Sequence, residues 1–181
     1  MSPDVAPCPA ERDVPLGAPG PVDDAERVLR FVPVSAWLVW DPQGRPRLAP
    51  AAFPREELRG DGDKSVSVLR DKTPKVEVVR RAAARNREPT WGQDPVTACA
   101  PVQLLRQIQD NMQRREVCVN ADPVEDALGF CPTHASVLRA CPPLDMAQRL
   151  AWTVIRTKLA DQFTEVAHCS GQPVTQVNSS P

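Results

Sequence analysis

The segment Lys64-Ser-Val-Ser-Val-Leu69 alternates polar and apolar side chains, and a period of two is typical of a half-buried β-strand. In such a strand Val66 and Val68 face the interior, while Ser65 and Ser67 face the solvent. The preceding stretch Arg59-Gly-Asp-Gly-Asp63 is rich in turn-forming residues and predicts a loop. The pattern therefore predicts a sheet that is buried on one side.

Two other segments predict strands of the same sheet. Val34-Ser-Ala-Trp-Leu-Val-Trp40 is mainly apolar, and it ends at Asp41-Pro-Gln-Gly44, which has the proline and glycine positions of a type I turn. Glu116-Val-Cys-Val-Asn120 is a shorter apolar run, and Pro123 follows it closely. A hairpin in which Arg47 to Phe53 returns beside the first of these strands is compatible with the turn, with Pro50 confining the returning strand to an edge.

Helical patterns lie between the predicted strands. The clearest runs from Leu144 to Phe163, where apolar residues recur at spacings of three and four. Further helices are expected in four segments, after Asp23 through Leu29, from Thr73-Pro74 to near Asn86, from Val102 to Arg115, and from Pro132 to Ala140. The expected fold is α+β or mixed α/β, a single small domain in which three to four helices pack on a short sheet.

The distribution of proline and bulky apolar residues predicts three regions. Residues 1–22 contain six prolines and few large apolar side chains, so we expect a disordered Pro-rich arm. Residues 23–169 carry the apolar segments of one globular domain, and residues 170–181 form a polar, flexible tail.

The charge of the chain is nearly balanced, with 22 basic and 23 acidic residues among 181, for a net charge of −1. A neutral chain has no long-range field for phosphate or anionic lipid, so a nucleic-acid partner is not favoured. The apolar run from Val32 to Trp40 is too short to span a bilayer, and no secretory pattern begins the sequence. We expect a cytoplasmic protein, and the scarcity of lysine beside arginine suggests a bacterial GC-rich genome.

Six cysteines are scattered along the chain, and in a domain of this size we expect free thiols. Cys131-Pro-Thr-His134 is the one short cysteine and histidine grouping, and it is also where a histidine-activated thiol could form. Zinc prefers four nitrogen or sulfur ligands, of which this pair supplies two. Cys131 and His134 are therefore an alternative hypothesis for a metal site, and no cofactor is expected.

One enzyme hypothesis starts from Arg30, before the first strand, and from Ser65-Val-Ser67. This order resembles the mono-ADP-ribosyltransferases, which use an arginine, a serine-bearing strand and a glutamate to hold NAD and stabilise the sugar cation. The resemblance implies Arg30, Ser65 and Ser67 as site residues, with Glu116 or Glu165 as the glutamate. The Glu-x-Glu element of that family is absent.

Two further groups are typical of binding sites. Trp37 and Trp40 have opposite parity on one predicted strand, so each face of that strand carries one tryptophan. Arg80 and Arg81 lie on a predicted helix and could contact a partner protein or a phosphate backbone. The favoured function is a non-enzymatic accessory protein that binds a protein partner or forms a homo-oligomer, with ADP-ribosyl transfer and nucleic-acid binding as alternatives.

Overall fold

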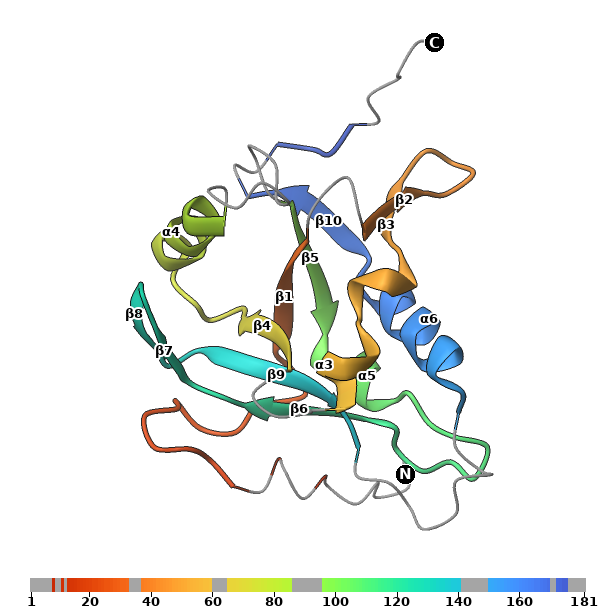
Figure 1. The fold of residues 1–181 in the computed structure, drawn as a ribbon, viewed down its shortest axis with the longest axis horizontal. Helices are drawn as coiled ribbons and strands as arrows, with labels where there is room; N and C mark the ends of the chain where they lie inside the picture. The colour runs from red at the N-terminus through yellow and green to blue at the C-terminus, as the bar shows by residue number, and fades with distance from the viewer. Residues whose placement is uncertain are drawn as a thin grey trace.

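The centre of the computed structural model is a six-stranded antiparallel sheet (Figure 1). The structure describes residues 8, 11, 13–32, 37–59, 65–85, 96–140, 150–169 and 172–175. From one edge to the other the strands are β10 (Glu165–His168), β5 (Val96–Pro101), β1 (Arg27–Val32), β4 (Val66–Arg70), β9 (His134–Arg139) and β6 (Val117–Ala121).

Alternating side chains give this sheet one buried, apolar face. Val28, Arg30 and Val32 are the buried positions of β1, and β5 alternates in the same way. The two strands pair along their whole length, from Arg27 opposite Pro101 to Val32 opposite Val96. Successive side chains of a strand point to opposite faces, so the neighbouring residues Leu29 and Phe31 belong to the other face.

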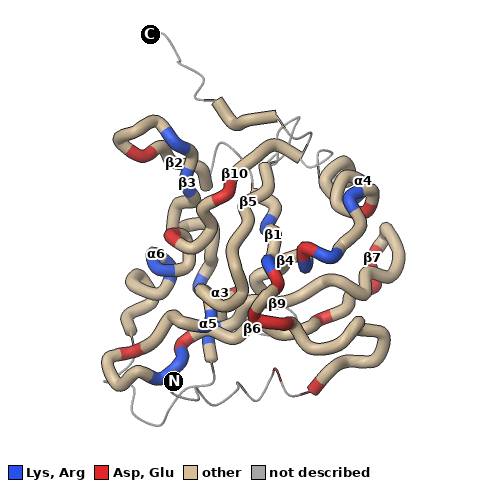
Figure 2. The backbone as a smooth tube through the Cα atoms, turned by 180° about the vertical axis from the view of Figure 1, so that it is seen from behind, with Lys and Arg blue, Asp and Glu red and all other residues tan. Residues whose placement is uncertain are grey.

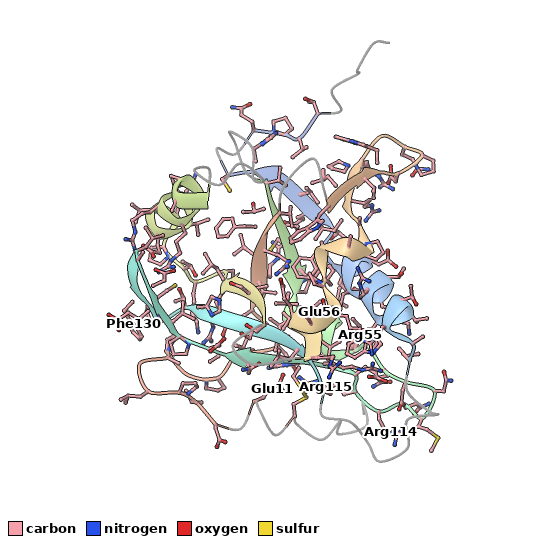
Figure 3. The ribbon with its side chains drawn as sticks, in the orientation of Figure 1. Glu11, Arg55, Glu56, Arg114, Arg115 and Phe130 are labelled. Atoms are coloured by element: carbon pink, nitrogen blue, oxygen red, sulfur yellow. A yellow bond between two sulfur atoms is a disulfide. The ribbon has the colours of Figure 1, made fainter. Side chains whose placement is uncertain are left out.

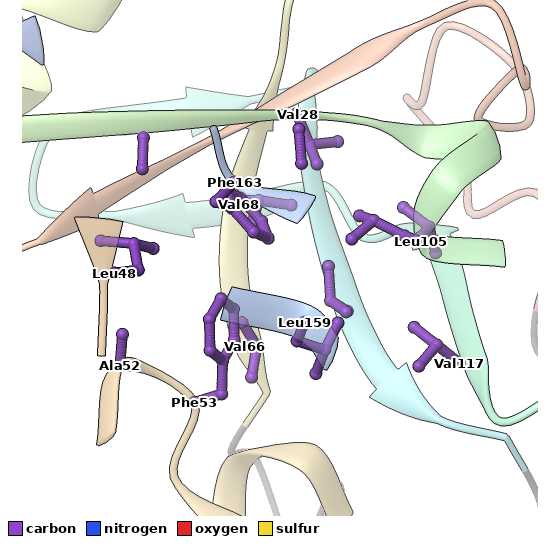
Figure 4. Close-up of a cluster of buried hydrophobic side chains, with 14 of the residues drawn as sticks. Val28, Leu48, Ala52, Phe53, Val66, Val68, Leu105, Val117, Leu159 and Phe163 are labelled. Atoms are coloured by element: carbon purple, nitrogen blue, oxygen red, sulfur yellow. The ribbon is translucent and has the colours of Figure 1, made fainter. Parts of the chain in front are cut away.

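Short helical segments cover the apolar face. They are η1 (Pro50–Ala52), α3 (Arg55–Arg59), α5 (Val102–Arg106) and α6 (Trp152–Gln162). Figure 4 shows Phe53, Leu159 and Phe163 packed among the valines of the sheet, and the Phe53 and Phe163 ring centroids are 5.2 Å apart. Burial of this apolar surface is the main stabilising contribution to the fold, at about 25 cal/mol per Å².

The other face of the sheet carries α4 (Lys75–Arg85) and the hairpin of β7 (Val124–Asp126) and β8 (Gly129–Cys131). In Figure 1, α4 lies apart from α3, α5 and α6. A second hairpin, of β2 (Leu38–Trp40) and β3 (Pro46–Leu48), forms its own two-stranded sheet.

The expected fold class was wrong, because the structure is mostly β. Six strands build the main sheet, so it is not a short sheet covered by three to four helices. The segment Pro132 to Ala140 was predicted to be a helix but contains β9, which pairs with both β4 and β6. Pairing with two distant strands overrides the local helical signal.

Two other helix predictions were wrong. The segment after Asp23 contains β1 rather than a helix, and the helix from Val102 ends at Arg106 rather than Arg115. The expected strand Val34 to Trp40 is described only from Trp37 onward, and there it forms β2 of the separate hairpin. By contrast, β4, β6 and α4 were predicted close to their observed positions.

The long C-terminal helix is shorter in the described part of the chain, where α6 begins at Trp152; residues 141–149 lie outside the described ranges. Cys8 and Cys118 form a disulfide, so the expectation of free thiols was wrong for this pair. Part of the expected flexible arm thus contacts the domain, and Val22 is buried in the core. None of the described helices has the length and apolarity that crossing a bilayer requires.

Candidate functional site

A cavity of about 530 Å³ lies between the outer face of the sheet, α4 and the β7–β8 hairpin. Polar side chains from β4, β9 and the end of β6 line it, together with apolar side chains such as Phe31, Leu69 and Leu128. Pockets of about 300–1,000 Å³ with an apolar lining and a few convergent polar groups are typical small-molecule sites. This cavity is therefore the candidate site.

Two of its polar residues, Ser67 and His134, are in contact. In the antiparallel pair of β4 and β9, Leu69 lies opposite His134 and Ser67 lies opposite Ser136. Ser67 and His134 are thus diagonal neighbours on the same face of the sheet, where side chains can reach each other. The Ser67 Oγ is 2.7 Å from the His134 Nε2.

The main chain fixes the other ring nitrogen of His134. Its Nδ1 lies 2.5 Å from the carbonyl oxygen of Asp122, and the Asp122 amide donates a hydrogen bond of 3.1 Å to the carbonyl of His134. A carbonyl only accepts hydrogen bonds, so Nδ1 carries the hydrogen. In the neutral ring Nε2 is then an acceptor, and the Ser67 hydroxyl donates to it.

The carboxylate of Asp122 lies near Ser67 and His134, but the closest contact of Asp122 with the His134 ring is made by its carbonyl oxygen. Its Oδ2 is 3.7 Å from His134 Nδ1, farther than the carbonyl oxygen of the same residue. The Ser136 hydroxyl is hydrogen-bonded to Oδ2, and it lies 2.7 Å from the Ser65 hydroxyl. Ser65 therefore shares the cavity with Ser67 but belongs to a different hydrogen-bond chain.

On the α4 side, Arg81 and Ala84 line the cavity. Arg81 donates to Glu77 at 2.6 Å, to Asp126 at 2.6 Å and to the Gly129 carbonyl at 3.1 Å. Burial alone would lower the pKa of Arg81, but its bonds with Glu77 and Asp126 raise that pKa above its usual value. Arg80 binds Glu77 at 2.7 Å and the Leu128 carbonyl at 2.5 Å.

Arg80 and Arg81, the two arginines predicted to bind a partner, thus connect α4 to the β7–β8 hairpin. In Figure 2 the Lys and Arg positions and the Asp and Glu positions are both spread along the described backbone. Phosphate binding by α4 would require Arg80 and Arg81 to exchange their present acidic and carbonyl partners for the ligand.

Arg30 lies beside Ser67 but faces the core. Its Nη1 donates to the Ser67 carbonyl at 3.2 Å, and its Nη2 is 3.1 Å from Glu57 Oε2. The guanidinium stacks on Trp37 and Phe53, with distances of 5.3 and 5.5 Å to the ring centroids. Arg30 and the Ser67 hydroxyl thus point to opposite faces of the sheet.

The glutamates expected beside Arg30 make other contacts. Glu116 forms an ion pair of 3.0 Å with Arg139, and Glu165 forms one of 2.5 Å with Arg27. Glu57, which lines the cavity, is the glutamate that binds Arg30. The structure therefore does not gather Arg30, the serine hydroxyls and Glu116 or Glu165 in one cleft.

The tryptophans and the cysteine–histidine pair are also placed by the structure. Trp37 and Trp40 both pack against the core cluster as partly buried side chains. Cys131 is buried, and its Sγ is 3.8 Å from the Thr133 hydroxyl, while the ring of His134 contacts Ser67 and Asp122. The single His, Cys, Asp and Glu grouping at ligand distances in the described ranges is Cys8, Glu11 and Cys118.

Sequence reasoning found Ser67 and His134 separately and missed their contact. Sixty-seven positions separate them, and Pro132 to Ala140 was expected to be helical. As a strand, this segment places His134 and Ser136 on one face, which is the signal that could have linked them to Ser65 and Ser67. The sequence does not indicate Asp122 as a site residue, because the group that contacts His134 is the main-chain carbonyl, which every residue has.

The comparisons with known proteins do not extend this picture. No protein-family model, curated protein or solved structure matches the chain. The assignment of a function therefore depends on the geometry of the cavity and on the chemistry of the groups that line it.

Proposed function

We propose that the chain is a serine-dependent hydrolase or acyltransferase for a small ester or amide substrate, with Ser67 as nucleophile and His134 as general base. The observation that carries this proposal is the 2.7 Å contact between Ser67 Oγ and His134 Nε2, with Nδ1 fixed by the Asp122 carbonyl. A serine hydroxyl is a weak nucleophile until an adjacent base accepts its proton. This arrangement supplies such a base in the correct tautomer.

The reaction follows from these positions. His134 Nε2 takes the hydroxyl proton while Ser67 Oγ forms a bond to the substrate carbonyl carbon. The imidazolium then gives this proton to the leaving group, and the bond between that group and the acyl carbon breaks. Water, or another acceptor, releases the acyl group from Ser67 through the same base. The Asp122 carbonyl and the nearby carboxylate stabilise the imidazolium at Nδ1.

The surroundings of the pair favour a small substrate. The cavity of about 530 Å³ is in the range of ligand pockets. His134 is largely buried, with 8% of its side chain exposed, whereas 41% of Asp122 is exposed. Burial of the base strengthens its electrostatic interaction with Ser67, because less water screens it.

The functions expected from the sequence have less support from the geometry and stay proposals. A protein partner would have to bind tryptophans that pack on the core. Nucleic-acid binding would have to compete with the acidic partners of Arg80 and Arg81. ADP-ribosyl transfer would need Arg30 to leave its core-facing position beside Trp37.

The proposal is tested with a fluorophosphonate probe, which reacts with activated serine hydroxyls, followed by peptide mass spectrometry. We expect a single label on Ser67 that is absent from the Ser67→Ala variant. In His134→Ala the labelling rate should fall by about 10²–10⁴-fold, the usual contribution of a general base.

The matched control is Ser65→Ala, which removes a hydroxyl from the same cavity without touching His134. Its labelling rate should stay close to that of the wild type. Labelling at another residue, or an equal rate in His134→Ala with its circular dichroism unchanged, would contradict the proposal.

A further inference from the structure

A cluster of metal-ligating side chains lies at the β6 edge of the sheet, away from the Ser67 cavity. Cys8 and Cys118 are joined there, with Cα atoms 6.0 Å apart, although 110 positions separate them in sequence. Both cysteines are almost fully buried, at 4% and 2% exposure. One ligand atom each from Cys8, Cys118 and Glu11 lies within 4.8 Å of the other two.

The Glu11 carboxylate is held in place independently of the two sulfurs. Its Oε1 accepts hydrogen bonds from Arg115, from Arg106 Nε at 3.1 Å and from the Val119 amide at 2.6 Å. Figure 3 shows Glu11 and Arg115 beside each other below β6. These bonds all end on Oε1, and within the described ranges no hydrogen bond is found on Oε2. The donors thus fix the position of the carboxylate, and one of its oxygens lies within 4.8 Å of both sulfurs.

We propose that Cys8, Cys118 and Glu11 form a site with two states: a disulfide when oxidised, and a binding site for a thiophilic divalent cation such as Zn²⁺ when reduced. Two thiolates and a carboxylate are a ligand set that zinc accepts, with water in the fourth position. This inference is independent of the proposed function of Ser67.

The required movement is small. Zinc binds sulfur at about 2.3 Å, so two sulfurs on a tetrahedral ion lie about 3.8 Å apart. A disulfide holds them about 2.05 Å apart. The sulfurs therefore separate by roughly 1.7 Å on binding, which side-chain rotation can supply while Glu11 keeps its position.

The electrostatics of the cluster also suit both states. A dithiol reductant gives two electrons and two protons to the disulfide and itself becomes a disulfide; the cation then displaces the two thiol protons. A dication with two thiolates has the same net charge as a neutral disulfide. The net charge that the ion pairs of Arg106 and Arg115 with Glu11 and Asp24 surround is therefore the same in the oxidised and in the metal-bound state. Donors that orient a ligating carboxylate are a common feature of metal sites.

The test uses the full chain with Co²⁺ as a spectroscopic substitute for zinc. After reduction and removal of the reductant, we expect one equivalent of Co²⁺ to bind and to produce a thiolate-to-cobalt charge-transfer band, which zinc then displaces. The oxidised wild type is the internal control, because its sulfurs are joined and it should produce no band. Absence of the band from the reduced protein would overturn the proposal.

Variants identify the ligands. Cys118→Ser should lose the band, whereas a Cys99→Ser, Cys169→Ser variant should keep it, because those two cysteines line a pocket that contains none of the three proposed ligands. Glu11→Gln keeps a carbonyl oxygen for Arg115 and should bind cobalt about 10–100-fold more weakly. A band retained in Cys118→Ser, or unchanged affinity in Glu11→Gln, would overturn the proposed ligand set. The circular dichroism spectrum of each variant shows whether it is folded.

Discussion

Arg70 shows how a single residue connects distant parts of this chain. Its side chain is fully buried at the end of β4, and it binds the Glu26 carboxylate through Nε at 2.7 Å and also through Nη2. It also donates to the carbonyls of Gly20 and Pro21, at 2.8 and 2.7 Å. The segment before β1 is thereby fixed to the sheet.

The Glu26 side of this pair predicts a pH dependence. Burial raises the pKa of Glu26, but hydrogen bonds from Arg70 and Lys72 and from the Asp23 amide outweigh it and lower the pKa from 4.5 to about 2. A carboxyl group with a depressed pKa stabilises the fold above its unfolded pKa, and this contribution is lost as the pH falls. The Glu26 contribution should therefore disappear between about pH 4.5 and 2.

Urea unfolding at a series of pH values measures this effect. Over that window the free energy of unfolding of the wild type should fall more steeply than that of Glu26→Gln, which cannot titrate at this position. The comparison also removes the effect of other carboxyl groups with a lowered pKa, such as Asp110 and Asp126, because both proteins share them. Parallel curves would show that Glu26 does not titrate in this way.

At the scale of elements, the attachment of α4 to the β7–β8 hairpin closes one side of the cavity. Arg81 makes two contacts with the hairpin, to Asp126 and to the Gly129 carbonyl, and one with Glu77 of α4; it is nearly buried, whereas Arg80 is about half exposed. Hydrogen bonds to charged groups contribute about 1.5–3 kcal/mol when they are buried, but exposed ion pairs contribute about 0–1 kcal/mol. The two neighbouring arginines should therefore differ in their structural effect.

Hydrogen–deuterium exchange tests this difference. In Arg81→Met the amides of residues 124–131 should exchange faster, and the free energy of unfolding should fall by about 1–3 kcal/mol. The matched variant Arg80→Met removes the same charge from the same helix and should cost less than about 1 kcal/mol. Equal effects of the two variants would mean that Arg81 does not fasten the hairpin.

Elements with a local signal were predictable from the sequence, and elements defined by distant pairing were not. Alternation predicted β4, and Thr73-Pro74 predicted the start of α4. β9 lies between β4 and β6 and pairs with both, and its first four residues, in which His134 and Ser136 alternate with Ala135 and Val137, are all buried. Its proline-led segment matched a helix start instead.

The candidate site follows the same rule. The polar face of β4, with Ser65 and Ser67, could be predicted from local alternation. The contact of Ser67 with His134 depends on the register of β4 against β9, which is set by tertiary packing. The Cys8–Cys118 disulfide was not predicted for a similar reason, because it depends on a tertiary contact that places Cys8 beside β6.

For the whole molecule, Cys8 and Glu11 cover the exposed edge of the sheet at β6. β6 is an edge strand, and such strands present backbone groups without strand partners. Here side chains bind them: Glu11 accepts from the Val119 amide, while Arg106 donates to the Val119 carbonyl at 3.0 Å and Arg115 to the Val117 carbonyl at 2.7 Å. The Cys8–Cys118 disulfide holds the arm in this position.

The length of the loop closed by this disulfide predicts a large effect of reduction on stability. In the chain-entropy description, a cross-link stabilises the fold by restricting the unfolded chain, and a loop of about 100 residues corresponds to about 4.7 kcal/mol. The sulfurs are 110 positions apart, so reduction should lower the free energy of unfolding by about 3–5 kcal/mol. The contacts of Glu11 belong to the folded state and do not depend on the covalent bond, so the reduced protein should still fold.

Urea unfolding with and without a phosphine reductant measures the loss, and Cys8→Ser, which has no such bond to break, should respond little to the reductant. Zinc added to the reduced wild type should restore part of the lost free energy, because a ligand that binds only the folded state stabilises it by mass action. In Cys8→Ser zinc should restore nothing. A wild type whose stability is insensitive to the reductant would mean that the arm does not constrain the unfolded chain, and the stabilising role of the disulfide would have to be abandoned.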